Sequence, residues 1–141
     1  FERIIMVDIS HKPKHVNHGF LVLINPEITF CEENSLGREG CLSVRDYTGK
    51  VERAKSITLK ALNQKGKKLE FKMSGYKARA VQHEIDHLDG KLFLDRLVSR
   101  RNALSVKGIL SVKDLLIYYE KWFELTLYGN IKKRPAYSAG R

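Results

Sequence analysis

The sequence contains little cysteine and no apolar run long enough to cross a membrane. Its 141 residues include two cysteines, Cys31 and Cys41. This is too few for a disulfide framework and favours a reducing, intracellular setting. No stretch of 18 apolar residues occurs, so we expect neither a transmembrane helix nor a membrane partner. No basic stretch followed by an apolar core and a small-residue cleavage site is present, so we also expect no secretory signal.

Acidic residues are few relative to basic ones. The chain has 26 Lys and Arg against 16 Asp and Glu, a formal net charge of +10. The excess is uneven, because Arg96–Arg141 holds ten basic residues and three acidic ones. Such a basic segment favours attraction to a polyanion, with RNA preferred over DNA. A solvated, solubilising surface is the alternative interpretation, and the charge alone does not separate the two.

The apolar content that is present, 43% of the chain, suits one compact domain over residues 1–141. We predict an α+β fold in which antiparallel β-sheets pack around a central helix, followed by a C-terminal helix. A helix is indicated after Ser74, a suitable N-cap, with its end near Gly90. Strands are expected at 3–9, 20–25, 28–31, 51–53, 56–62 and 68–73, loops at 10–19 and 32–40, an extended segment at 91–97, and the C-terminal helix at 111–129.

The hexapeptide Gln-His-Glu-Ile-Asp-His, at residues 82–87, carries the strongest chemical signal. On a helix, His83 and His87 project from the same face, so both imidazoles can reach one ion. Glu84 stands beside them, where it can take a proton from a water that the ion activates. The pattern therefore predicts a hydrolytic metal site on the central helix.

Two histidines leave such a site incomplete, because a hydrolytic metal takes three protein ligands and keeps one position open. No histidine follows His87. Upstream, residues 39–43 read Glu-Gly-Cys-Leu-Ser, and Cys41 in that segment can present a thiolate to the helix. One thiolate and two imidazoles suit Zn²⁺ by ligand chemistry alone.

Taken together, residues 39–43 and the heptapeptide Gln-His-Glu-Ile-Asp-His-Leu at 82–88 resemble two motifs of the peptide deformylases. Both match without substitution and in the family's order, and the resemblance covers about residues 3–94. A third family motif, Gly-x-Gly-x-Ala-Ala-x-Gln, would precede the first strand and is not found. We therefore expect a deformylase-like domain that is N-terminally incomplete, with a catalytic region at about 3–97 and a basic helix or tail at about 98–141.

The resemblance implies a role for each matched residue. It makes Cys41, His83 and His87 the metal ligands, Glu84 the general base, and the backbone N–H of Leu42 a donor to the oxyanion. It also implies one divalent ion, Fe²⁺ before Zn²⁺, Ni²⁺ or Co²⁺. The iron assignment therefore comes from the resemblance, whereas zinc comes from the ligand types.

Substrate contacts are expected on both sides of this cluster. We assign them to Gly40 by the resemblance, and to Tyr76, Arg79 and Ala80 because they precede His83 by one or two helical turns. The stem of Arg79 is expected to line a pocket wall while its charge reaches water.

Two carboxylates near the motifs are less defined. Glu39 is either a loop carboxylate or a partner of Arg53 that supports the ligands, and we favour the second interpretation. Asp86 could cap the helix, face solvent or support a ligand, and the sequence leaves these open.

The function implied by the resemblance is removal of the formyl group from N-formylmethionine of nascent polypeptides, with release of formate. The expected partners are the nascent peptide and, through the basic C-terminal segment, the ribosome. The expected location is the bacterial cytoplasm, with an organelle as the alternative. A His-Glu-x-x-His metalloprotease is a competing interpretation, weakened by the cysteine and by the lack of a downstream third ligand. A catalytically weak or silent homologue that binds the ribosome or RNA is another.

Overall fold

The computed structural model describes residues 2–8, 19–99, 103–105 and 108–109. Within these residues the strands form one antiparallel six-stranded sheet in the order β1-β2-β3-β5-β6, with β4 paired to β3. The expected mixture of antiparallel strands and a helix is confirmed, as a single sheet. The elements are β1 (Ile4–Asp8), β2 (Phe20–Cys41), β3 (Val44–Leu62), β4 (Lys68–Ser74), α1 (Gly75–Leu88), the 3₁₀ helix η1 (Phe93–Arg96), β5 (Ala103–Ser105) and β6 (Gly108–Ile109).

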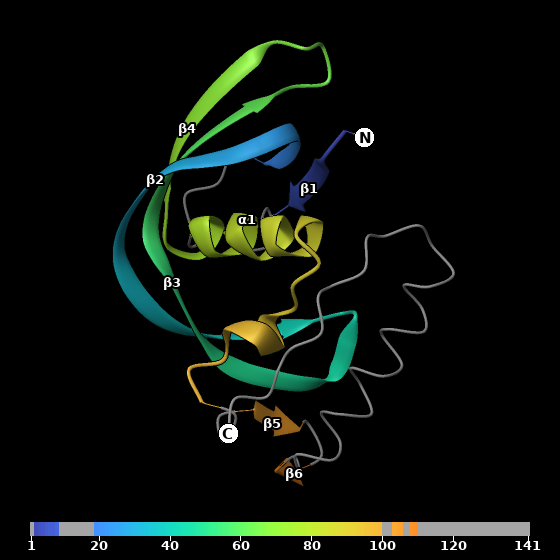
Figure 1. The fold of residues 1–141 in the computed structure, drawn as a ribbon, viewed down its shortest axis with the longest axis vertical. Coiled ribbons are helices and arrows are strands. Elements are labelled where there is room, and N and C mark those ends of the chain that lie inside the picture. The colour runs from blue at the N-terminus through green and yellow to red at the C-terminus, as the bar shows by residue number, and fades with distance from the viewer. Residues whose placement is uncertain (1, 9–18, 100–102, 106–107, 110–141) are drawn as a thin grey trace, which may run out of the picture.

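Strands β2 and β3 are long and strongly curved, and they bend around α1 (Figure 1). Three interruptions of their register, at Ile24/Glu27, Ile28/Phe30 and Gly40/Cys41, allow this bending, since a bulge adds local twist and curvature to a strand. Helix α1 lies in the hollow that the two strands form. The curvature therefore brings the far ends of β2 and β3 back toward the helix.

The predicted loop at 32–40 is wrong, because this segment pairs with β3 from Glu32↔Ser56 to Gly40↔Thr48. Its polar residues read as a loop, but they lie on the exposed part of a strand that gains its stability from the ladder. The strands predicted at 20–25 and 28–31 also belong to β2, which continues through Pro26. This proline sits in a bulge next to Asn25, whose φ of 51° turns the chain and lets the strand resume.

Strand β3 is also longer than expected, since the separate strands at 51–53 and 56–62 form one continuous element. The predicted hairpin from β3 to β4 is confirmed. Its turn is organised by Asn63, whose side-chain oxygen accepts the backbone N–H groups of Lys65 and Lys67, both at 2.9 Å. This hairpin leads directly into α1.

Helix α1 begins and ends where the sequence indicates. Ser74 is its N-cap residue, although its hydroxyl makes no capping hydrogen bond. Gly90 follows the helix with a φ of 67°, a conformation that glycine adopts without strain. The expected extended segment at 91–97 is partly wrong, because η1 forms there. The carboxylate of Asp95 caps the start of η1 by accepting the backbone N–H of Leu92 at 2.8 Å.

Two apolar clusters hold these elements together. The larger lies between the sheet and α1, and it includes Leu23, Leu59 and Val81, all fully buried. The smaller surrounds Phe93 of η1 at the other end of β3. The two motifs, at 39–43 and 82–88, therefore fall between two packed regions, which fix α1 on one side and the β2–β3 connection on the other.

Two further predictions concern helices. The C-terminal helix predicted at 111–129 lies outside the described residues. Within the described residues, none of the helices is long and apolar enough to span a membrane.

Candidate metal centre

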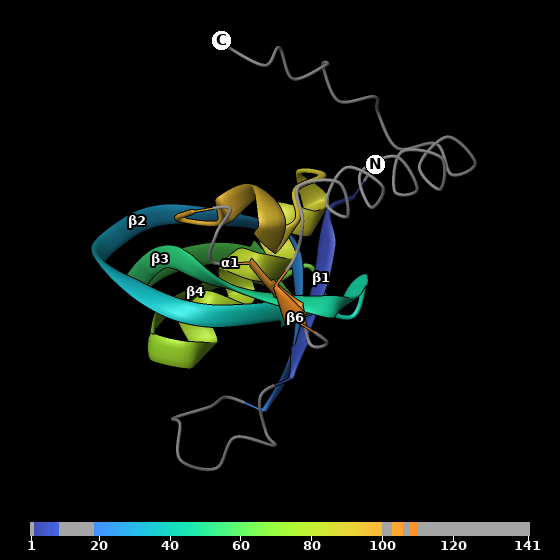
Figure 2. The same ribbon diagram turned by 90° about the horizontal axis from the view of Figure 1, so that it is seen from below.

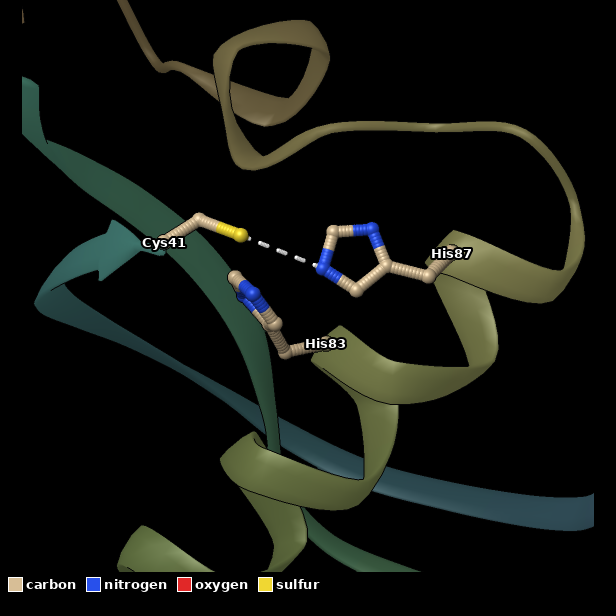
Figure 3. Close-up of side chains that lie close together, drawn as sticks. All are labelled: Cys41, His83 and His87. Carbon is tan, nitrogen blue, oxygen red and sulfur yellow. Dashed lines mark hydrogen bonds between the residues drawn. The ribbon is translucent and has the colours of Figure 1, made fainter. Parts of the chain in front are cut away.

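Cys41, His83 and His87 converge on one point. One ligand atom from each of the three side chains lies within 4.8 Å of the others. Sγ of Cys41 is 3.3 Å from Nε2 of His87, and the two rings meet edge to face at 4.7 Å between centroids. Figure 3 shows the thiol pointing from the end of β2 toward both imidazoles, which project from successive turns of α1. All three side chains are half-buried.

This arrangement fits a divalent metal ion. In a tetrahedral zinc site, a sulfur about 2.3 Å and a nitrogen about 2.0 Å from the ion lie roughly 3.5 Å apart. The Cys41–His87 separation of 3.3 Å is close to that value. One thiolate and two imidazoles supply three protein ligands, which matches a catalytic site with one position left for water or substrate.

The backbone places Cys41 at a turn. A register shift between Gly40 and Cys41 ends the regular ladder, and Cys41 then pairs with Val44 across a two-residue turn. The side chain of Cys41 packs against the apolar cluster around Phe93. At Gly40, a β-carbon would lie 3.3 Å from the methyl group of Thr48, so a larger residue would crowd the facing strand.

A carboxylate fixes one of the two imidazoles. Oε2 of Glu39 lies 3.1 Å from Nδ1 of His83, which makes Nδ1–H the donor and leaves Nε2 free to bind a metal. Glu39 also accepts two hydrogen bonds from Arg53, at 2.7 and 2.9 Å, and one from Arg79, at 2.8 Å. Each oxygen of this buried carboxylate therefore has two N–H donors. The predicted pairing of Glu39 with Arg53 is confirmed.

Arg53 continues the network to a second buried carboxylate. Its Nη1 donates to Asp86 at 2.7 Å, and Arg96 of η1 donates to the same carboxylate at 2.7 and 3.1 Å. The open question about Asp86 is thereby answered, since it lies buried among arginines and ties α1 to β3 and η1. Charged donors on both oxygens of a buried carboxylate offset part of the cost of removing it from water.

The same contacts shift the acid–base properties of the cluster. Burial raises the pKa of the Cys41 thiol, but hydrogen bonds from His83 and His87 outweigh it and lower the pKa to about 5. Burial lowers the pKa of His83, yet its bonds to Cys41 and Glu39 raise it to about 9. A bound cation would take the place of these protons, and the low pKa of the thiol suits Cys41 to be a thiolate ligand.

The remaining predicted site residues surround the cluster. Glu84 is half-buried on α1 between the two histidines. Leu42 occupies the turn after Cys41 with 87% of its side chain exposed. Tyr76, 38% exposed, and half-buried Ala80 lie on α1 at helical spacing before His83, although Ala80 also packs against the larger apolar cluster.

Arg79 differs from the expectation in one respect. Its charge was expected to reach water, but its side chain is 12% exposed and its guanidinium points inward, to Glu39, Ser35 and the backbone oxygen of Val51. The reason is that the interior beside Glu39 offers several acceptors at once. A stem that lines a pocket is compatible with this position, whereas a solvated charge is not.

Sequence reasoning missed two supporting residues. Arg96 was not considered, because its role depends on η1 folding back toward α1. Gln82 was noted only as part of the motif, yet its amide accepts the N–H of Ala54 at 3.1 Å and donates to the carbonyl of Ala54 at 2.9 Å. Gln82 thus bonds α1 to β3 one residue before His83. The sequence motif at 82–87 could have drawn attention to Gln82, whereas no feature of the sequence points to Arg96.

Fold and site together define an α+β protein whose helix presents two histidines to a cysteine on the neighbouring strand. The family model for polypeptide deformylase matches residues 2–103. A peptide deformylase from Thermodesulfovibrio yellowstonii is 46% identical over 112 residues, covering 79% of this chain and 67% of that protein. The chain belongs to the polypeptide deformylase family.

Solved structures agree with this assignment. A ligand-bound class I type b peptide deformylase from Acinetobacter baumannii superposes with a TM-score of 0.62 at 45% identity, covering 67% of this chain and 61% of that one. A structure of a class I type b peptide deformylase from the same organism with Met-Ala-Ser bound has a TM-score of 0.58 at 42% identity, covering 65% and 58%. The chain spans about three fifths to two thirds of the length of these relatives.

Proposed function

We propose that this protein is a metal-dependent amide hydrolase that removes the formyl group from N-formylmethionyl peptides and releases formate. The observation that carries the proposal is the convergence of Cys41, His83 and His87 within 4.8 Å in a member of this family. The relative from Acinetobacter baumannii with Met-Ala-Ser bound supports a methionyl peptide as the product. Residues 3–97 form the proposed catalytic region.

Cys41, His83 and His87 would hold the ion, and Glu39 would keep His83 in the tautomer that binds through Nε2. The ion supplies Lewis acidity toward water and toward the formyl oxygen. Fe²⁺ is the proposed native metal, with Zn²⁺, Ni²⁺ or Co²⁺ as substitutes. The ligand set itself accepts any of these, because imidazole and thiolate bind several divalent first-row metals.

Glu84 acts as the base. It takes a proton from the water that attacks the formyl carbon and passes it to the amide nitrogen as the C–N bond breaks. The new carbon–oxygen bond converts the formyl group to formic acid, which loses its remaining proton to solvent to give formate, and the methionine amine departs with the proton that Glu84 transferred. The backbone N–H of Leu42 donates to the oxygen on which negative charge develops.

The substrate would lie along the end of β2 and the start of α1. Gly40 permits close approach of the peptide backbone, while Tyr76, Ala80 and the stem of Arg79 form the wall for the methionine side chain. The exposed side chain of Leu42 lies in the turn that follows Cys41, beside this region.

The wider setting follows from the substrate. A formylated N-terminus occurs on nascent chains, so we propose action in the bacterial cytoplasm, beside the ribosome. The net positive charge of Arg96–Arg141 supports attraction to ribosomal RNA.

The experiment is formate release from formyl-Met-Ala-Ser by the complete gene product, loaded with Fe²⁺ or Ni²⁺ under anaerobic conditions. Acetyl-Met-Ala-Ser is the matched control, because it tests whether the small formyl group is required. Formate release from the first peptide only is the expected result. Metal-loaded protein that releases none would overturn the proposal and favour a silent homologue, whereas cleavage within longer unformylated peptides would indicate a metalloprotease.

A further inference from the structure

Arg79 makes more polar contacts than a residue lining a substrate pocket needs. Its Nη1 donates to Oε1 of Glu39 at 2.8 Å and to the carbonyl of Val51 at 3.0 Å. Its Nη2 donates to the carbonyl of Ser35 at 2.7 Å and lies 3.3 Å from the hydroxyl of the same residue. One guanidinium thus joins α1 to β2 and β3 and to the carboxylate that bonds His83.

The sequence provides the space for this guanidinium at Gly37. A β-carbon at residue 37 would lie 2.7 Å from Cζ, 2.8 Å from Nε and 2.9 Å from Nη2 of Arg79. No side chain can share that volume with the guanidinium in its present position. Gly37 pairs with Val51 in the β2–β3 ladder, so the missing side chain opens a slot beside one of the acceptors of Arg79.

We propose that Arg79 is a positioning residue of the metal centre, acting through Glu39 on the ligand His83. The inference rests on the proposed metal site and concerns a residue that touches neither the ion nor the reacting atoms. Arg79 fills the last acceptor position of the Glu39 carboxylate and holds it at the correct place on β2. The carboxylate in turn holds the ring of His83 with its Nε2 toward Cys41.

Arg79 matters to Glu39 because of the number of hydrogen-bond donors around this carboxylate. A carboxylate offers about four lone-pair positions, and Arg53, Arg79 and His83 occupy two on each oxygen. Removing Arg79 leaves Oε1 with one donor inside the protein and removes one positive charge. The carboxylate can then rotate or admit water, and the orientation of the His83 ring loosens.

The test measures metal affinity in addition to catalysis. Arg79→Met keeps most of the stem and removes the donors. Arg79→Lys keeps the charge but cannot reach all the acceptors at once. Arg3→Met is the control, because Arg3 forms an exposed ion pair with Asp89 at the other end of α1. Dissociation constants for Co²⁺ and Zn²⁺ come from competition with a chelator, alongside kcat and KM for formyl-Met-Ala-Ser.

Arg79→Met is expected to weaken metal binding by roughly 10-fold, the lower end of the range for partners of metal-binding histidines, because Arg53 keeps two donors on Glu39. Arg79→Lys should restore part of the affinity and Arg3→Met should leave it unchanged. In Zn²⁺-loaded protein, the NMR signal of the Nδ1–H proton of His83 should shift or broaden in Arg79→Met. Loss of that hydrogen bond is the signature that a purely structural role would not produce.

Several outcomes would overturn the inference. Unchanged metal affinity with a raised KM would leave Arg79 with only its proposed place in the wall of the substrate site. Unchanged affinity with only a lower urea midpoint would make it a purely structural residue. If wild-type protein and Arg79→Met bound metal equally well, the inference about Arg79 would be refuted but the proposed metal centre would stand. Wild-type protein without metal affinity would refute the proposed centre as well.

Gly37→Ala provides an independent route if Arg79→Met does not fold. The added methyl group displaces the guanidinium without removing it, so metal affinity should fall as in Arg79→Met. In the double variant the two losses should not add, because the methyl group then has nothing to displace. Additive losses, or normal metal affinity in Gly37→Ala, would contradict the role given to Arg79.

Discussion

Nδ1 of His83 lies 3.1 Å from Oε2 of Glu39, although 44 residues separate them in the chain. This contact joins the two sequence motifs, because Glu39 belongs to the first and His83 to the second. The carboxylate selects the ring nitrogen that faces Cys41 and is itself held by two arginines. Glu39 and its two arginines therefore orient a proposed metal ligand in the protein without an ion.

Cys41→Ser should reduce metal affinity by at least about 10²-fold, since a hydroxyl does not ionise near neutral pH and leaves two imidazoles as ligands. Metal content after dialysis against a weak chelator measures the effect. Cys31→Ser is the matched control, because Cys31 is exposed on the same strand. Equal metal content in the two variants would remove Cys41 from the ligand set.

Glu84→Gln separates the chemical step from metal binding. The amide cannot accept the proton, so kcat should fall by roughly 10²–10⁴-fold, the usual contribution of a general base. Metal content should stay at the wild-type level, since Glu84 is absent from the ligand cluster. Glu52→Gln, an exposed change on β3, is the control. Substantial activity in Glu84→Gln would mean that another group carries the proton.

The meeting of the two histidines could be predicted from the sequence because it depends on a local rule. His83 and His87 are four residues apart on a helix, and helical periodicity alone places them together. The segment around Cys41 marks it as a candidate third ligand, but only the resemblance links it to the two histidines, because the sequence does not show how far β2 bends. Its position depends on a ladder with β3 and on bulges that pattern reading took for loop.

The supporting network could be predicted only in part. Glu39 and Arg53 were paired correctly, but the inward turn of Arg79 depends on a slot left by Gly37 on another strand. The contact of Arg96 with Asp86 depends on η1, where the sequence predicts an extended segment. Polar residues that serve a buried network look like solvated surface in a sequence, because burial is decided by tertiary contacts.

The basic C-terminal segment should contribute to ribosome association. Changing Lys132, Lys133 and Arg134 to Gln, or deleting residues 113–141, should weaken co-sedimentation with ribosomes at low salt and flatten its salt dependence. The control changes Lys65, Lys67 and Lys68, which are exposed in the β3–β4 hairpin, so both triple variants lose the same charge. Equal effects of the two triple variants would indicate general charge attraction. An unchanged deletion variant would rule out docking through this segment.

Glu39 should make stability depend on pH in the acid range. Burial raises the pKa of Glu39, but donors from His83, Arg53 and Arg79 outweigh it and lower the pKa from 4.5 to about 2. The folded state therefore binds this proton less readily than the unfolded chain. The stabilisation is fully present above about pH 4.5 and is lost as the pH falls toward 2, and it amounts to about 3 kcal/mol at most.

Urea unfolding of chelator-treated protein at pH 7, 4 and 3 measures this contribution. Glu39→Gln should lower stability at pH 7, because Arg53 loses an anion, and should lose less stability than wild type between pH 4 and 3. Glu33→Gln is the control. The pKa of Glu33 is also lowered, by a hydrogen bond and charge from Lys55, but that pair is exposed and should change stability little. A Glu39→Gln variant with the wild-type acid profile would show that the four donors around this carboxylate do not stabilise its ionised form.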